Sequence, residues 1–207
     1  MGNRTNWRRD ILILDKTLDY YNKNALNYTE STVSADMTLL YTLFLKHLNS
    51  GAHILDLGCG SGRDSKYFID NGYIIDAVDG SHELCKIASE FLKHPVRQLL
   101  FQELDYIEIF DAVWACATLL HIPKDVLPEI FHKIYKALKS SGILYVSFKY
   151  GNFSGIRNSR LFTDLDEAGL QKIINEQEFN ILEICISNDV RHGRSGEKWL
   201  NAILQKN

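Results

Sequence analysis

The chain has 207 residues, of which 45% are hydrophobic and 24% charged, a composition typical of one globular domain rather than of a disordered protein. Its formal net charge of −3 excludes a broadly basic surface for nucleic acid or membrane lipids. No apolar run approaches the roughly 20 residues of a membrane-spanning helix, and the four cysteines form no Cys-x-x-Cys pair. These features predict a cytoplasmic protein with free thiols and no metal site.

Hydrophobic periodicity predicts alternating strands and helices, and therefore an α/β fold with a largely parallel sheet. Residues 1–50 are expected to be mainly helical and to form a lid or extension on a ligand-binding domain at 51–207. Within that domain, the expected strands are 53–57, 73–78, 96–104, 111–117, 143–148, 181–188 and 197–205, and the expected helices are 62–71, 82–93, 124–139 and 164–178.

Turn signals refine these bounds. Gly72 and Gly142 are expected to close the helices that precede them, and Ser81 is expected to cap the helix that follows it. Residues 149–163 read as a polar loop. Because only a short loop joins the last two strands, the last strand should run antiparallel in a doubly wound sheet of seven strands.

The strongest local signal is a glycine-rich turn, Gly58-x-Gly60-x-Gly62, between the first strand and the first helix of this domain. Glycines permit positive φ and a close approach of the backbone to a ligand, and the helix N-terminus adds free N–H groups. Asp79, at the end of the second strand, can accept both hydroxyls of a ribose. A dinucleotide site is disfavoured, because Arg63 replaces the required small residue and Asp56 would repel a pyrophosphate.

An ordered set of motifs resembles class I S-adenosylmethionine-dependent methyltransferases. The motifs are Ile54–Gly62 with Asp79, Phe110–Cys116, Leu119–Pro123 and Leu138–Leu144. The resemblance implies a Rossmann-like methyltransferase fold and S-adenosylmethionine as cofactor, with S-adenosylhomocysteine as the product. The segments 63–65, 189–194 and 199–201 are similar to small methyltransferases of the tellurite-resistance type.

The resemblance also implies a cofactor site at the ends of the first four strands, covered by the N-terminal segment. Asp79 should hold the ribose, and Gln102 or Glu103 the adenine amino group, with a solvated loop as the alternative for the last two. Tyr28 should belong to the lid, where its ring can pack on the sulfonium, with a structural aromatic contact at the sheet edge as the alternative. The expected members of the site are Tyr28, Asp56, Gly58, Cys59, Gly60, Asp79, Gly80, Ser81, Gln102, Glu103 and Ala115.

Cationic side chains gather in the loops at the carboxyl ends of the strands, where open α/β sheets bind ligands. They predict a small anionic or electron-rich acceptor held by Arg157, Arg191 and Arg194, because the planar guanidinium matches oxyanions. Ion pairs with nearby carboxylates are the alternative for each arginine. His121 is the candidate catalytic residue, either as a base or as a packed histidine that holds its loop. The whole set is His121, Lys149, Arg157, Arg160, Arg191, His192 and Arg194.

Four functions stay open on the sequence. They are methyl transfer to a small molecule, methyl transfer to RNA or protein, a non-catalytic module that senses the cofactor, and a nicotinamide oxidoreductase. The lack of a separate substrate domain favours a small acceptor, while basic loops beside aromatic residues keep nucleic acid as an alternative. The sequence does not predict the oligomeric state.

Overall fold

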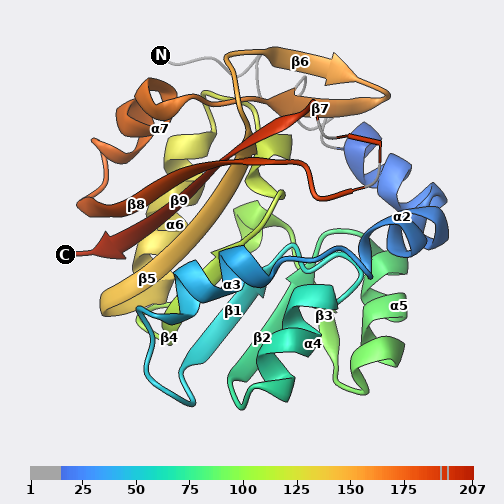
Figure 1. Ribbon diagram of the computed structural model, residues 1–207, viewed down its shortest axis with the longest axis horizontal. Coiled ribbons are helices and arrows are strands. Elements are labelled where there is room, and N and C mark those ends of the chain that lie inside the picture. The colour runs from blue at the N-terminus through green and yellow to red at the C-terminus, as the bar shows by residue number, and fades with distance from the viewer. Residues whose placement is uncertain (1–14, 192, 195) are drawn as a thin grey trace.

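Seven strands form one central sheet in the computed structural model, which describes residues 15–191, 193, 194 and 196–207 (Figure 1). The strand order is β3-β2-β1-β4-β5-β9-β8. Strands β1 to β5 pair in parallel, and β9 runs antiparallel between β5 and β8. The predicted fold, a mostly parallel sheet with an antiparallel last strand, is confirmed. The bounds are β1 His53–Leu57, β2 Ile74–Asp79, β3 Val96–Gln98, β4 Phe110–Ala115, β5 Leu138–Lys149, β8 Phe179–Asn188 and β9 Lys198–Lys206.

Helices cover both faces of the sheet. One hydrophobic cluster joins helices α3, α4 and α5 to one face, and a second joins α6 and α7 to the other. Residues 15–23 and α2 are helical as well, in line with the helical character predicted for the N-terminal segment. The bounds are α2 Ala25–Thr32, α3 Thr38–Leu45, α4 Arg63–Asp70, α5 His82–Leu92, α6 Leu127–Ala137 and α7 Glu167–Ile174.

Alternation along the central strands builds the two cores. In β1, Ile54 packs with the α3 side while Leu55 and Leu57 pack with the α6 side, as a side-chain period of two requires. On the α3 side, Trp114 of β4 stacks on Tyr145 of β5 with ring centroids 3.8 Å apart. Burial of each such side chain contributes about 1.5–3 kcal/mol to folding, so this sheet is a rigid base for the loops at its edge.

Two of the three predicted caps are confirmed. Gly72 has φ +83° after α4, and Ser81 Oγ accepts a hydrogen bond from the backbone N of Leu84 at 3.2 Å. The third prediction is wrong. Helix α6 ends at Ala137, the chain enters β5 directly at Leu138, and the positive φ in that segment belongs to Ser141 rather than to Gly142.

The segment predicted as a polar loop contains a β-hairpin instead. Strands β6 (Ser154–Arg157) and β7 (Arg160–Thr163) pair antiparallel. The two residues between them, Asn158 and Ser159, have φ +47° and +65°, which is the pattern of a type I′ turn. The hairpin places its side chains beside the carboxyl edge of the main sheet.

The third strand is shorter than predicted, because it ends at Gln98 and not at Leu104. A short 3-10 helix, η1 (Phe101–Glu103), follows it. The carboxylate of Glu103 accepts a hydrogen bond from the backbone N of Leu100 at 2.9 Å and so closes this turn. The chain therefore folds across the end of the sheet where the sequence suggested a continuing strand.

Side-chain contacts tie the N-terminal helices to the edge of the sheet. Thr17 Oγ1 accepts a hydrogen bond from the backbone N of Leu161 in β7 at 3.0 Å, and Asn22 Oδ1 accepts one from Ser81 Oγ at 2.7 Å. Residues 1–14 and His192, which the sequence analysis included, lie outside the described residues. Across the described ranges, no helix is both long and apolar enough to cross a membrane.

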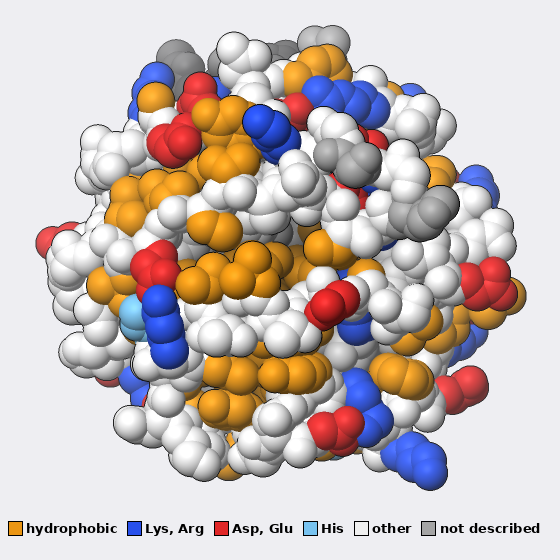
Figure 2. Space-filling view, in the orientation of Figure 1, with side chains coloured by type: hydrophobic (Ala, Val, Ile, Leu, Met, Phe, Trp, Pro, Cys, Tyr) orange, Lys and Arg blue, Asp and Glu red, His pale blue; other side chains and the backbone are white. Residues whose placement is uncertain are grey.

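Acidic and basic side chains are interspersed on the face of the molecule shown in Figure 2. Hydrophobic side chains occupy much of its centre, and neither sign of charge dominates. This face therefore carries no broad basic patch, as the net charge of −3 led us to expect. The concentrated charge lies instead inside a cavity.

Candidate functional site

The glycine-rich turn between β1 and α4 is held close to two neighbouring segments. The backbone N atoms of Gly58 and Cys59 both donate to the carbonyl of Val78, at 2.8 and 3.0 Å. Gly58 has φ +80°, and a Cβ added there would lie 2.0 Å from Thr118 Oγ1. Gly60 has φ +56°, and its added Cβ would lie 3.1 Å from the ring of Tyr28. Glycine is therefore required at position 58 for its conformation and for its lack of a side chain.

Asp79 closes this turn from the end of β2. Its Oδ2 accepts a hydrogen bond from Gly60 N at 2.9 Å, and its Oδ1 accepts one from Ser81 N at 2.8 Å. Burial raises the pKa of the Asp79 carboxyl, although these backbone donors oppose the shift. The backbone donors fix the carboxylate in place, and each oxygen can still accept a further hydrogen bond from a ligand.

A cavity of about 430 Å³, called here the large cavity, lies between the glycine turn and the N-terminal helices. This volume is within the range of about 300–1,000 Å³ that is usual for small-molecule sites. Leucine and phenylalanine side chains contribute much of its apolar lining. The lining is Asp15, Thr17, Leu18, Tyr21, Tyr28, Gly58, Gly60, Asp79, Gly80, Leu84, Leu99, Leu100, Phe101, Gln102, Glu103, Ala117, Thr118, His121, Val126 and Glu129.

Seven of the expected cofactor residues line this cavity among those that the structure describes. They come from four separate segments, which the fold brings together at the carboxyl ends of the strands. The seven are Tyr28, Gly58, Gly60, Asp79, Gly80, Gln102 and Glu103.

The other expected cofactor residues take different places. Asp56 is 1% exposed, and its Oδ2 accepts a hydrogen bond from Ser65 Oγ at 2.6 Å, below the turn. Burial and the nearby Asp64 raise the pKa of Asp56, which disfavours its charged form. Ala115 is fully buried in β4, and Ser81 serves as the cap of α5. None of these three side chains lines a described cavity.

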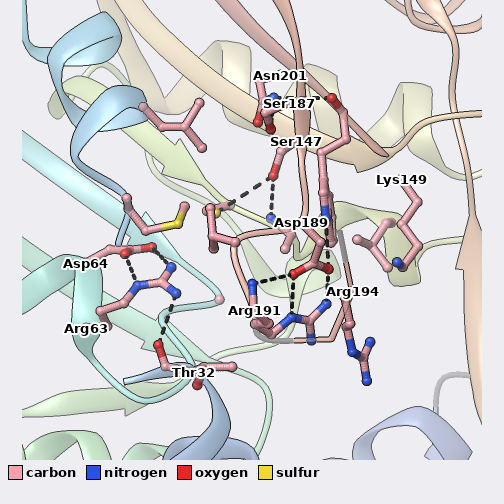
Figure 3. A pocket seen from close by; sticks show the side chains of 18 of the residues that line it. Thr32, Arg63, Asp64, Ser147, Lys149, Ser187, Asp189, Arg191, Arg194 and Asn201 are labelled. Atoms are coloured by element: carbon pink, nitrogen blue, oxygen red, sulfur yellow. Dashed lines mark hydrogen bonds and ion pairs between the residues drawn. The ribbon is translucent and has the colours of Figure 1, made fainter. Parts of the chain in front are cut away.

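A second cavity, the small cavity of about 110 Å³, adjoins the first on the side of β5, β8 and β9 (Figure 3). Cys59 lines it, and burial raises the pKa of that thiol, so the thiol stays neutral. Ser147, Ser187 and Asn201 form a polar floor, with Asn201 Nδ2 donating to Ser187 Oγ at 3.0 Å. The residues common to both cavities form their shared wall: Tyr21, Tyr28, Gly58, Ala117 and His121.

Charged side chains concentrate around the small cavity. Among the described residues its lining has five lysine or arginine side chains and two carboxylates. Arg63 donates from Nε and NH2 to Asp64, at 2.6 and 2.9 Å, and Arg191 makes a similar two-pronged contact with Asp189 (Figure 3). Burial raises the pKa of Asp189, but the hydrogen bonds from Arg191 outweigh it and hold this pKa at about 2.

Three more cations belong to this region. Lys149 and Arg194 both pair with Glu197. Arg160, which the sequence analysis counted only as one of several loop cations, lines the small cavity from β7. Arg157, which was expected to hold the acceptor, does not line either cavity, because its guanidinium is paired with Asp164 at 3.0 and 2.7 Å.

His121, in the 3-10 helix η2 (Leu119–His121), has defined partners on both ring nitrogens. Its Nδ1 lies 2.6 Å from the carbonyl oxygen of Leu161, which can only accept, so Nδ1 carries the proton. Nε2 therefore accepts the hydrogen bond from the hydroxyl of Tyr21 at 2.7 Å. Burial lowers the pKa of His121 to about 4, so the ring is neutral near pH 7. Tyr21, which the sequence analysis did not select for the site, lines both cavities together with His121.

Residues 55–146 match the family model described as a methyltransferase domain. A Bacillus subtilis protein that carries a methyltransferase name, YqeM, is 32% identical over 127 residues, which are 55% of this chain and 49% of that protein. The chain spans less than half the length of the curated relatives that it matches.

Solved structures show the same fold. A Burkholderia thailandensis 1,6-didemethyltoxoflavin-N1-methyltransferase, with bound 1,6-didemethyltoxoflavin and S-adenosylhomocysteine, has a TM-score of 0.77 and 20% identity over 100% of this chain and 92% of that chain. The [4+2]-cyclase SpnF has a TM-score of 0.70 and 18% identity over 91% and 94% of the two chains. The fold alone therefore does not specify one reaction. Residues 55–146 thus match a model of the enzyme class predicted from the motifs, and the S-adenosylhomocysteine in the Burkholderia thailandensis structure is the product of the predicted cofactor.

Proposed function

We propose that this chain transfers the methyl group of S-adenosylmethionine, bound in the large cavity, to a small anionic or nucleophilic acceptor bound in the small cavity. The observation that carries the proposal is the shared wall of the two cavities. The cofactor supplies an electrophilic methyl group on its sulfonium. The protein has to bring a nucleophile into line with that group, and two adjoining cavities do so without a catalytic metal or covalent intermediate.

The cofactor residues follow from the large cavity. The Asp79 carboxylate would accept the ribose hydroxyls, and the part of the lining around Gln102 and Glu103 would hold the adenine. Gly58 and Gly60 would let the backbone approach the methionine end of the cofactor. Residues 15–28 cover this cavity, which supports the proposal that residues 1–50 are a lid on the domain formed by 51–207.

The charges of the small cavity favour an anionic acceptor. Its five cations outnumber its two carboxylates, and the pair between Arg194 and Glu197 is exposed, so Arg194 can exchange Glu197 for a ligand. Arg191 and Arg194 would contribute to binding. The small volume favours a small molecule over RNA or protein, and the related structure from Burkholderia thailandensis holds a small molecule.

His121 would act on the acceptor through Tyr21. The neutral imidazole can take a proton at Nε2, but the Tyr21 hydroxyl occupies that position. A proton released by the acceptor would pass to the tyrosine oxygen as the tyrosine proton moves to Nε2. The alternative is that His121 only orients Tyr21, because methyl transfer depends more on alignment than on a base.

A finer proposal concerns the subfamily. The segments that resemble tellurite-resistance-type methyltransferases contribute Arg63, Asp64, Asp189, Arg191 and Arg194 to the small cavity. The residues that carry the resemblance therefore surround the proposed acceptor site. This supports both the assignment to that subfamily and an oxyanion-like acceptor.

The test is a methyl-transfer assay with S-adenosylmethionine labelled on its methyl group. The candidate acceptors are oxyanions, small carboxylates, thiols, nucleotides and RNA. Transfer to a small anion, reduced by Arg191→Ala and Arg194→Ala but not by Lys172→Ala on the exposed side of α7, would support the proposal. Cofactor binding without transfer to any acceptor would favour a non-catalytic sensing module, and transfer to RNA alone would overturn the small-acceptor proposal.

A further inference from the structure

The β6–β7 hairpin sets two arginines directly opposite each other. Arg157 and Arg160 are the pair that closes the type I′ turn. Like charges at directly opposed positions of an antiparallel pair are unfavourable unless each has its own counter-charge. Arg157 has one, because Asp164 accepts two hydrogen bonds from its guanidinium.

Among the residues that the structure describes, no carboxylate pairs with Arg160. Within the described part of the chain it makes one hydrogen bond, from NH1 to the hydroxyl oxygen of Tyr21 at 3.3 Å, although a guanidinium has five donors. Its Nε is buried and has no hydrogen-bond partner in the described ranges. The remaining contacts are with aromatic rings, whose centroids lie 4.4 Å from the guanidinium carbon for Tyr20 and 5.2 Å for Phe162.

The aromatic rings hold the guanidinium in place, and the single hydrogen bond to Tyr21 leaves most of its donors unused toward the described residues. The other arginines of the small cavity differ in this respect, because Arg63, Arg191 and Arg194 each pair with a carboxylate. Arg160 also lines the cavity next to Tyr21, which belongs to the shared wall. It is therefore the best-placed cation for a negative charge brought in by a ligand near the transferred methyl group.

We propose that Arg160 is the anchor for a carboxylate of the acceptor, and that the acceptor is a small planar carboxylate. The proposal rests on the proposed function and makes it more specific. A carboxylate matches the planar donor set of a guanidinium, and the rings of Tyr21, Tyr145, Phe162 and Trp199 in the cavity lining suit a flat molecule. With its carboxylate on Arg160, the acceptor has its nucleophilic atom toward Tyr21 and the shared wall.

Calorimetry on the protein saturated with S-adenosylhomocysteine tests this assignment without requiring turnover. Benzoate is the probe, and benzamide is its uncharged counterpart of nearly equal shape. The wild-type protein is expected to bind benzoate more tightly than benzamide. Arg160→Gln is expected to weaken benzoate binding by roughly tenfold or more and to leave benzamide binding unchanged. Arg160→Lys keeps the charge but loses the planar pair of donors, so its benzoate affinity is expected to lie between those of the wild type and Arg160→Gln.

The control is Arg97→Gln, which removes an exposed arginine that also lies over a tyrosine ring, at 5.7 Å, but lines neither cavity. Its benzoate affinity should equal that of the wild type. Equal benzoate binding by wild type and Arg160→Gln, or no preference of the wild type for benzoate over benzamide, would overturn the anchor. Failure of the proposed function is distinguishable, because it would appear as a lack of S-adenosylhomocysteine binding in the first titration or as a lack of methyl transfer. Failure of the anchor would appear instead as benzoate binding that does not depend on Arg160.

Discussion

Replacement of Gly58 by alanine is expected to destabilise the protein and to distort the large cavity, whereas the same replacement at Gly72 should only strain the backbone. The two glycines have almost equal φ, +80° and +83°, so both substitutions place alanine in the left-handed region at a cost of about 1–2 kcal/mol. At Gly72 nothing lies within 4 Å of the added Cβ.

At Gly58 a collision is added to the strain. The new Cβ would lie 2.0 Å from Thr118 Oγ1 and 2.7 Å from Thr118 Cβ, whereas carbon atoms normally pack at roughly 3.5–4.0 Å. Either Thr118 or the turn has to move by more than an ångström, and overpacking of this kind costs about 1–3 kcal/mol. The free energy of unfolding should therefore fall by about 2–5 kcal/mol in Gly58→Ala and by about 1–2 kcal/mol in Gly72→Ala.

Urea unfolding measures both losses, and calorimetry with S-adenosylhomocysteine measures the effect on the cavity, whose wall contains Gly58 and Thr118. Only Gly58→Ala should weaken binding. Adding Thr118→Gly to Gly58→Ala removes the colliding side chain and should recover part of the lost stability. Equal losses in the two single variants, with unchanged binding in both, would refute the argument that this turn needs glycine for close packing.

Three further outcomes follow from individual side chains. Asp79→Asn should lower the affinity for S-adenosylhomocysteine by roughly 10- to 100-fold in calorimetry. The substitution removes a charged acceptor and turns an amide nitrogen toward a backbone N–H. Asp76→Asn on the same strand is the control and should leave the affinity unchanged. Because burial lowers the pKa of His121 to about 4, the unfolded chain binds this proton first as the pH falls. The free energy of unfolding should then decrease between pH about 6.5 and 4 by up to about 1.4 kcal/mol per pH unit, and this slope should become shallower in His121→Asn. Asp64→Asn should lower the free energy of unfolding in urea by about 3–5 kcal/mol, because it leaves the buried guanidinium of Arg63 without its counter-charge. A loss below about 1 kcal/mol would contradict the importance of this ion pair for stability.

The architecture was predictable from the sequence because its strongest signals are local. The central strands are recognisable by their runs of apolar residues, and the glycine turn follows β1 directly. Gly72 marks the end of one helix and Ser81 the start of the next. The predictions of secondary structure were wrong where contacts between distant parts of the chain determine the local structure. The β6–β7 hairpin is short and polar, and its only strong signal is the pair Asn158-Ser159, while the third strand ends early because η1 turns across the sheet edge.

The site was predictable to the extent that its residues sit in ordered motifs. Gly58, Gly60 and Asp79 line the large cavity as expected. Residues whose role depends on a partner far away in the sequence were not predictable. Tyr21 becomes important only through His121, one hundred positions later, and Arg160 only because Arg157 rather than Arg160 is paired with Asp164.

The central claim is that the large cavity binds S-adenosylmethionine. Calorimetric titration of the purified chain with S-adenosylhomocysteine, and separately with NADH, tests it most directly. The structure predicts saturable one-to-one binding of S-adenosylhomocysteine that is weakened in Asp79→Asn, and no binding of NADH. Saturable NADH binding with no heat from S-adenosylhomocysteine would contradict it.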